Sequence, residues 1–239
     1  NNNVVSDIGM CGKFPVIHSD AAILVSATSK DVVISNNRVS RASYIGIRSN
    51  SNSVIRNNVI DQTMLRMSDG GGIYVWGTNM EGCKIIGNIV TNVIGNPRPG
   101  AKPWAHGLYL DDRSGGITMT GNTVVNAVCG MHLHNTYNDV ITDNTIYQSR
   151  NYGYVIQEDR IVNVEGYIHD MVIKRNIFVG DKSDIPLVWF LGSLGSIDFG
   201  TYNENYFCNI ASAIAGKINT PEKDISCTFD KFKQITGQD

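Results

Sequence analysis

Residues 117–125 read Ile-Thr-Met-Thr-Gly-Asn-Thr-Val-Val, and residues 140–147 read Val-Ile-Thr-Asp-Asn-Thr-Ile-Tyr. Both stretches place an alternating apolar segment before an asparagine and a second β-branched segment after it. The two asparagines, Asn122 and Asn144, are 22 residues apart. Alternation of this kind is typical of β-strands, and its return at a period of roughly 20 to 50 residues is typical of a solenoid.

The asparagine pattern runs through most of the chain. Its asparagines are Asn3, Asn37, Asn58, Asn88, Asn122, Asn144 and Asn176. Successive members are 34, 21, 30, 34, 22 and 32 residues apart, which indicates a basic unit of 21 or 22 residues with insertions in the longer units. A third strand pattern follows in each unit and opens with glycine. Its copies are Gly46–Asn50, Gly72–Trp76, Gly107–Asp111, Gly130–His134 and Gly153–Gln157.

Three strands in each unit predict an all-β fold, a right-handed parallel β-helix solenoid with three sheets. One unit cannot bury its apolar face alone, whereas stacked units bury it and pair their strands about 4.8 Å apart. We expect this helix over residues 1–220 in about eight rungs, with a capping segment over residues 221–239. Within the cap, Pro221 to Gly237 is expected to form a short amphipathic helix that covers the strand edges. Asn1 to Asn3 resemble the middle of a rung, so the chain is expected to be the C-terminal part of a longer helix.

The amino-acid composition excludes several classes of binding partner. The 239 residues include 20 Lys and Arg and 22 Asp and Glu, so the net charge of −2 gives no footprint for nucleic acid. The five cysteines lack metal-binding spacing, and no apolar segment approaches transmembrane length. We therefore predict no nucleic-acid partner, no membrane insertion, no metal and no cofactor. A signal peptide pattern is absent from the first residues of this segment.

Strand alternation predicts one functional face. In each glycine-opened strand the second and fourth positions should face the core, and the third and fifth should face solvent. The expected outward residues are Arg48, Tyr74, Tyr109, His132, Val155, Asn50, Trp76, Asp111, His134 and Gln157. This mixture of aromatic, imidazole and carboxylate groups indicates a ligand-binding strip, although aromatic residues also favour strands for packing reasons alone. Asp111 and Asp112 could equally begin a turn.

Two long insertions fall beside that strip. Gln62–Gly71 contains Asp69, and Thr91–His106 contains Trp104 beside three prolines. Loops raised next to a strand face commonly wall a ligand site, so a groove is expected there.

The repeat with its asparagine ladder resembles the pectate-lyase-like superfamily of β-helices, from Asn3 to Phe178. Two motifs, residues 69–74 (Asp-Gly-Gly-Gly-Ile-Tyr) and 106–112 (His-Gly-Leu-Tyr-Leu-Asp-Asp), resemble β-helix glycoside hydrolases of the fucosidase-like and xylanase-like group. The tail from Phe229 to Asp239 is similar to the helix and Gly-x-Asp that end that group. The resemblance implies a catalytic carboxylate pair, Asp69 with Asp111 or Asp112.

Glycosidic cleavage commonly uses two carboxyl groups roughly 5 to 9.5 Å apart, a separation available between residues one or two rungs apart. The candidate catalytic residues are Asp69, Asp111, Asp112, Glu158 and His106. An extended chain would place Asp69 more than about 20 Å from Asp111, so this pair requires a loop that curls back. Without that curl, Asp111 and Glu158 form the better couple. The candidate substrate-binding residues are Arg48, Tyr74, Trp76, Trp104, Tyr109, His132, His134 and Gln157.

Hydrolysis of a polysaccharide or oligosaccharide is the favoured function, and two alternatives stay open. A polysaccharide lyase needs a base and a cation beside a uronate, for which Arg48, His132 and His134 are candidates. A tailspike or adhesin would bind glycans without cutting them, as a trimer rather than a monomer. The expected location is extracytoplasmic, either periplasmic or secreted, or on a virion.

Overall fold

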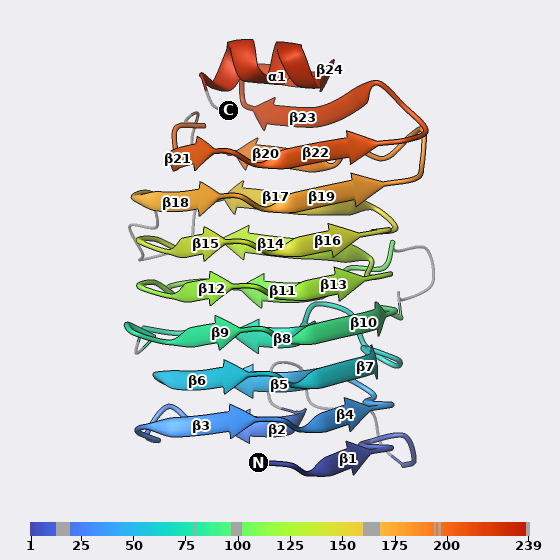
Figure 1. Cartoon of the computed structure of the whole chain (residues 1–239), viewed down its shortest axis with the longest axis vertical. Helices are drawn as coiled ribbons and strands as arrows, with labels where there is room; N and C mark the ends of the chain where they lie inside the picture. The colour runs from blue at the N-terminus through green and yellow to red at the C-terminus, as the bar shows by residue number, and fades with distance from the viewer. Residues whose placement is uncertain are drawn as a thin grey trace.

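The computed structural model describes residues 1–12, 20–78, 80–96, 102–159, 168–193, 195 and 197–237. These residues form a right-handed parallel β-helix, with rungs stacked along the long axis and the chain ends near opposite ends of the stack (Figure 1). Three sheets run along the stack, so the fold class predicted from the asparagine spacing is confirmed.

The asparagine sheet contains the strands that follow the repeated asparagines. Its order is β1 (Val4–Ser6), β4 (Arg38–Ser40), β7 (Val59–Thr63), β10 (Ile89–Val93), β13 (Thr123–Val125), β16 (Thr145–Tyr147), β19 (Ile177–Gly180) and β22 (Tyr206–Asn209). The third sheet contains the strands that precede them. Its order is β21 (Gly200–Asn203), β18 (Met171–Lys174), β15 (Val140–Thr142), β12 (Thr118–Thr120), β9 (Lys84–Ile86), β6 (Ser53–Arg56) and β3 (Val32–Ser35).

The glycine sheet contains the strands that begin near the repeated glycines. Its order is β2 (Ala21–Val25), β5 (Ile45–Ser49), β8 (Gly71–Val75), β11 (His106–Leu110), β14 (Cys129–His134), β17 (Tyr152–Glu158), β20 (Val188–Gly192), β23 (Ile214–Thr220) and β24 (Lys223–Thr228). All neighbouring pairs in it are parallel up to β23, which pairs with β24 in the antiparallel sense.

The strand register stacks apolar side chains of successive rungs directly on one another. In the glycine sheet Leu108 lies between Ile73 and Met131, and all three side chains are fully buried. Burial of an aliphatic side chain of this size contributes roughly 1.5 to 3 kcal/mol to folding. The interior of the helix is therefore a set of apolar ladders, and it fixes which side chains project to the outside.

The asparagines form the expected amide ladder. The Nδ2 group of Asn88 donates to Oδ1 of Asn122 at 3.0 Å, and Nδ2 of Asn122 donates to Oδ1 of Asn144 at 2.9 Å. Each Oδ1 also accepts the backbone N–H of the preceding rung's asparagine, at 2.9 Å from Asn88 to Asn122. The ladder continues from Asn176 to Asn205, which the sequence pattern did not include.

The C-terminal cap differs from the prediction in its first half. Residues 223–228 form β24 along the edge of β23, and α1 (Phe229–Thr236) begins only after them. Thr228 caps that helix by accepting the N–H of Lys231, so the helix over Pro221–Gly237 was predicted too long. Phe232 packs against the ring of Phe190 at 5.0 Å between centroids and closes the core. Residues 238 and 239 of the Gly-x-Asp ending lie outside the described residues.

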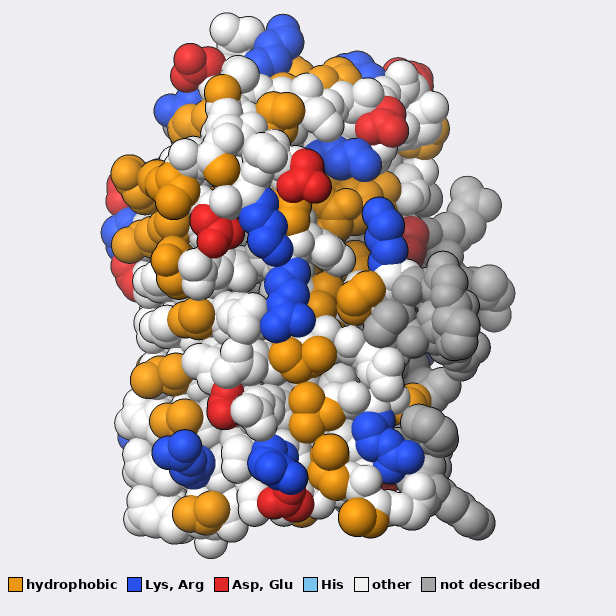
Figure 2. All heavy atoms as spheres, turned by 90° about the vertical axis from the view of Figure 1, so that its right-hand side faces the viewer, with side chains coloured by type: hydrophobic (Ala, Val, Ile, Leu, Met, Phe, Trp, Pro, Cys, Tyr) orange, Lys and Arg blue, Asp and Glu red, His pale blue; other side chains and the backbone are white. Residues whose placement is uncertain are grey.

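One face of the molecule mixes side-chain types. Figure 2 shows hydrophobic side chains interrupted by Lys, Arg, Asp, Glu and uncharged polar groups along the stack. In the described part of the chain, no helix is long and apolar enough to cross a membrane.

Candidate functional site

The glycine at the start of each site strand changes the direction of the side chains. A Cβ atom added to Gly107 would lie 2.3 Å from Cγ1 of Val124, so this residue faces the core just as Leu108 does. Two consecutive inward residues interrupt the alternation, and His106 therefore projects to the same side as Tyr109, with 4.4 Å between their ring centroids. Strict alternation would have placed these two rings on opposite faces.

A cavity of about 440 Å³ opens on the outer face of the glycine sheet. Its lining comes from strands β5, β8, β11, β14 and β17, or from residues next to them, and from the two long insertions. The lining residues are Arg48, Asp69, Tyr74, Trp76, Trp104, Tyr109, Asp111, Asp112, His132, His134 and Gln157. The structure thus brings together every candidate substrate-binding residue and three of the five candidate catalytic residues.

Several side chains expected to face solvent are buried instead. Tyr74 is 1% exposed, Tyr109 3% and His132 0%, so the exposure predicted for them is wrong. In-register rings cover one another, because Tyr109 stacks on His132 at 4.7 Å and meets Tyr74 edge-on at 5.2 Å between centroids. Trp104, from the second insertion, packs against His132 at 5.3 Å and covers the start of the strip. The strip is the floor of a walled cavity rather than an open surface.

Asp69 belongs to the first insertion and lines this cavity. Its backbone N–H donates to the carbonyl of Trp104 at 2.6 Å, and its own carbonyl accepts the Tyr44 hydroxyl at 2.6 Å. Asp69 adopts a left-handed backbone conformation with φ of 63°, which makes the sharp turn that returns its side chain to the cavity. Asp69 and Asp111 line the same cavity. Pro97 and Pro99 of the second insertion lie outside the described residues.

Two candidate catalytic residues do not reach the cavity. Glu158 is 1% exposed, and its Oε1 accepts the backbone N–H of Ile168 at 3.1 Å, so the alternative couple of Glu158 with Asp111 is not formed. His106 is fully buried behind Trp104 and His132, and burial lowers its pKa to about 3. Neither ring nitrogen of His106 has a hydrogen-bond partner among the described residues. Neither side chain is among the residues that line the cavity, so their proposed catalytic roles stay predictions.

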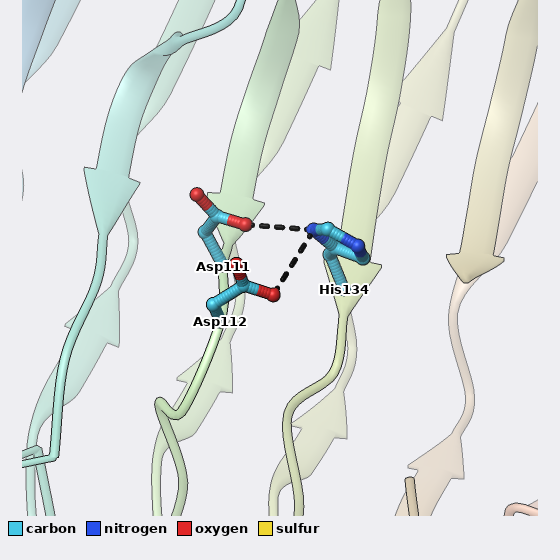
Figure 3. Close-up of side chains that lie close together, drawn as sticks. All are labelled: Asp111, Asp112 and His134. Carbon is cyan, nitrogen blue, oxygen red and sulfur yellow. Dashed lines mark hydrogen bonds and ion pairs between the residues drawn. The ribbon is translucent and has the colours of Figure 1, made fainter. Parts of the chain in front are cut away.

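At the centre of the site, one histidine lies between carboxylates. His134 Nδ1 donates to Oδ1 of Asp111 at 2.8 Å, and Asp112 Oδ1 lies 3.5 Å from the same nitrogen (Figure 3). Figure 3 shows the two aspartates at the end of one strand and His134 on the neighbouring strand. The other ring nitrogen, Nε2, lies 3.1 Å from Oδ1 of Asp159. The second oxygen of Asp111 accepts the Tyr74 hydroxyl at 2.7 Å.

These contacts shift the pKa values of His134, Asp111 and Asp112 in different directions. Burial lowers the pKa of His134, but hydrogen bonds to Asp111 and Asp159 and their charges outweigh it and raise the pKa to about 10. Burial raises the pKa of Asp111, yet the bonds and charge from His134 lower it overall. The pKa of Asp112 is raised by burial despite the hydrogen bond from Asn135. At neutral pH the site therefore holds a charged imidazolium against an ionised Asp111.

Sequence reasoning missed two polar members of the site. Asp159 follows Gln157 by two residues, so continuing the alternation past the end of the glycine-opened strand would have found it. Asn135 Nδ2 donates to Asp112 Oδ1 at 2.8 Å and to Asp159 Oδ1 at 2.9 Å. Asn135 lies in the turn after β14, where no strand pattern singles it out.

Comparison with known families gives a match over residues 59–187, more than half of the chain, to the family described as "Periplasmic copper-binding protein (NosD)". The chain belongs to the NosD family. The matched segment contains every lining residue of the cavity except Arg48. The family's description as periplasmic is consistent with the expected extracytoplasmic location. No curated protein and no solved structure matched the chain.

Proposed function

We propose that this NosD-family chain is an extracytoplasmic, periplasmic or secreted, glycoside hydrolase that holds a polysaccharide in the cavity of the glycine sheet. The proposal is carried by one observation, the presence of Asp69, Asp111 and Asp112 in a single aromatic-lined cavity. Asp69 comes from a loop on one side, and the other two carboxylates come from the end of β11. Cleavage of a glycosidic bond commonly uses a pair of carboxyl groups that flank the bond.

The tryptophans provide faces for sugar rings. Trp76 directly follows β8 and is 37% exposed, whereas Trp104 precedes β11 by two residues. The two indoles thus lie at opposite ends of the strip, with Tyr74 and Tyr109 between them. A sugar ring presents an apolar face that packs on an aromatic ring while its hydroxyls bond to polar groups at the edge. Two neighbouring sugar units held in this way would place their linkage over the carboxylates.

Protonation assigns a role to Asp111. This carboxylate is held ionised by His134 and accepts the Tyr74 hydroxyl, so it acts as nucleophile or general base and not as the acid. Asp69 is the partner that protonates the leaving oxygen. Asp69 and Asp111 both interact electrostatically with the Tyr74 and Tyr109 hydroxyls, whose pKa values are raised mainly by burial, so both carboxyl groups lie near these two hydroxyls.

The charge of the cavity favours a neutral glycan over a uronate. Three carboxylates line it, and among the lining residues only Arg48 and His134 carry positive charge, of which His134 is already paired with Asp111. A polysaccharide lyase must neutralise the uronate carboxylate of its substrate, and this lining would repel it. The face seen in Figure 2 is interrupted by charged side chains, so this face does not offer the continuous apolar contact expected of a trimeric tailspike.

Copper requires a separate comparison with the residues, because the family is described as copper-binding. Asp111, Asp112 and His134 are the one group of three in the described chain with ligand atoms within 4.8 Å of one another. It offers two carboxylates and one imidazole, and the described lining of the cavity contains no cysteine or methionine to select Cu(I). Both imidazole nitrogens are also engaged with carboxylates. These residues do not fit a Cu(I) site, and the proposed reaction uses no metal.

The test is incubation of the chain with neutral and with uronic polysaccharides, with and without a chelator. New reducing ends from a neutral glycan, unchanged by the chelator, support the proposal. Unsaturated products that absorb in the ultraviolet indicate elimination, and binding without cleavage indicates an adhesin. Activity that disappears with the chelator and returns with copper would overturn the metal-free mechanism.

A further inference from the structure

Asp159 stands out because nearly all of its polar contacts belong to the site, although it does not line the cavity. Its Oδ1 accepts from His134 Nε2 at 3.1 Å and from Asn135 Nδ2 at 2.9 Å, and its Oδ2 accepts from Gln157 Nε2 at 2.8 Å. Its backbone N–H donates to Oδ1 of Asn135 at 3.0 Å, so these two residues are joined in both directions. The carboxylate is therefore fixed in orientation even though 37% of its side chain is exposed.

The contacts of Asp159 determine the state of His134. A neutral imidazole carries one N–H, whereas the imidazolium carries two. Carboxylates face both ring nitrogens, so only the charged ring donates to both. Asn135 Nδ2 also lies 3.2 Å from Nε2, but its two amide hydrogens are engaged at shorter distances by Asp112 Oδ1 at 2.8 Å and Asp159 Oδ1 at 2.9 Å. Asp112 is 3.5 Å from Nδ1, and the pKa of His132, whose ring stacks on His134 at 5.5 Å, is lowered by burial.

We propose that Asp159 is a positioning residue for the hydrolysis proposed above, acting through His134 to hold the Asp111 carboxylate in place. With Nε2 anchored on Asp159, the ring cannot rotate, and Nδ1 points at Oδ1 of Asp111. Tyr74 holds the other oxygen, so the plane of the Asp111 carboxylate is set from both sides. Asp159 itself contacts no group that reaches the bond to be cleaved. This inference rests on the proposed function and assigns the orientation of its central carboxylate to a residue outside the cavity.

The experiment compares Asp159→Ala and Asp159→Asn with the wild-type chain. Asp143→Asn is the matched control, because Asp143 is a half-exposed aspartate paired with Arg175 in another turn. Loss of the anchor should lower kcat on the neutral glycan roughly tenfold or more and leave KM within about twofold, since Asp159 does not line the cavity. The alkaline limb of the pH profile should move to lower pH in the Asp159 variants only. Asp159→Asn should lose less, because its Oδ1 still accepts from Nε2.

A second readout does not depend on activity. In a sample with labelled histidines, NMR should show His134 with both ring nitrogens protonated at neutral pH in the wild type, and a lower titration midpoint in Asp159→Ala. If the chain cleaves no glycan but the His134 titration shifts, the proposed function fails and the anchoring role stands. Unchanged kcat and unchanged His134 titration, or an equal loss in Asp143→Asn, overturn the inference. Should Asp159→Ala fail to fold, the same comparison is decided by Asp159→Asn.

Discussion

A buried acid that does not line the cavity gives a quantitative prediction about stability. Asp139 is fully buried at the turn before β15, where its Oδ1 accepts the backbone N–H of Ile117 at 2.9 Å. Burial raises its pKa to about 7, although that bond and the one to Thr136 lower it. Thr136 has one hydroxyl hydrogen and two acceptors within reach, the carbonyl of Ser114 and Asp139 Oδ2. A protonated Asp139 resolves the conflict by donating to the Thr136 oxygen.

The sign of the pH dependence follows from this raised pKa. The folded chain retains the Asp139 proton to higher pH than the unfolded chain, so stability from this group is complete below pH 4 and is lost as the pH rises to about 7. The difference between about 7 and the ordinary value of 3.8 corresponds to roughly 4 kcal/mol. Asp139→Asn should recover that free energy, because an amide accepts from Ile117 and donates to Thr136 at every pH.

The assay is urea unfolding of Asp139→Asn and wild type at pH 4 and pH 8. The variant should be more stable at pH 8 by an amount approaching 4 kcal/mol and nearly equal to wild type at pH 4. Asp143→Asn serves as the control, since its partner Arg175 lowers the pKa of Asp143 and the change should give no stabilisation at pH 8. A stability difference for Asp139→Asn that is the same at both pH values would refute the reasoning.

Two further substitutions test the ladder and the cavity. Asn122→Ala removes the acceptor of Asn88 and the donor to Asn144 in the buried ladder, and it should destabilise the chain by about 3 kcal/mol or more, measured by urea unfolding. A cost below about 1 kcal/mol would show that the ladder does not hold the rungs. Trp76→Ala should raise KM for the glycan severalfold with little change in kcat or Tm, because Trp76 is 37% exposed. An unchanged KM would show that Trp76 does not bind the glycan and only packs against its neighbours.

The fold was predictable because its determinants are local and repeated. An asparagine every 21 to 34 residues, with β-branched residues after it, marks the same turn in each rung, and the structure forms the ladder there. Asn205 was not recognised as a member of the ladder because the strand after it, Tyr206–Asn209, lacks the valine or isoleucine found in the other copies. The start of the cap was mispredicted because its structure depends on a distant partner. Residues 223–228 form a strand by pairing with β23, and this pairing cannot be seen in the local sequence pattern of the cap.

The site was predictable in membership but not in geometry. Strand alternation identified most lining residues, because outward positions of adjacent rungs must be neighbours. It failed at Gly107, where a residue without a side chain allows two inward positions in a row. It also could not show that Asp69 lines the same cavity as Asp111, because that depends on how the two insertions meet in space. Burial of Glu158 against Ile168 was hidden for the same reason.

The central claim, cleavage of a glycan by the carboxylates of this cavity, is tested most directly by Asp111→Asn. The account predicts that the wild-type chain releases new reducing ends from a neutral polysaccharide and that the variant loses nearly all of this release. An asparagine can still accept the Tyr74 hydroxyl but loses the ion pair with His134, so Tm should fall while the fold persists. Full release by Asp111→Asn, with the fold intact, would contradict the account.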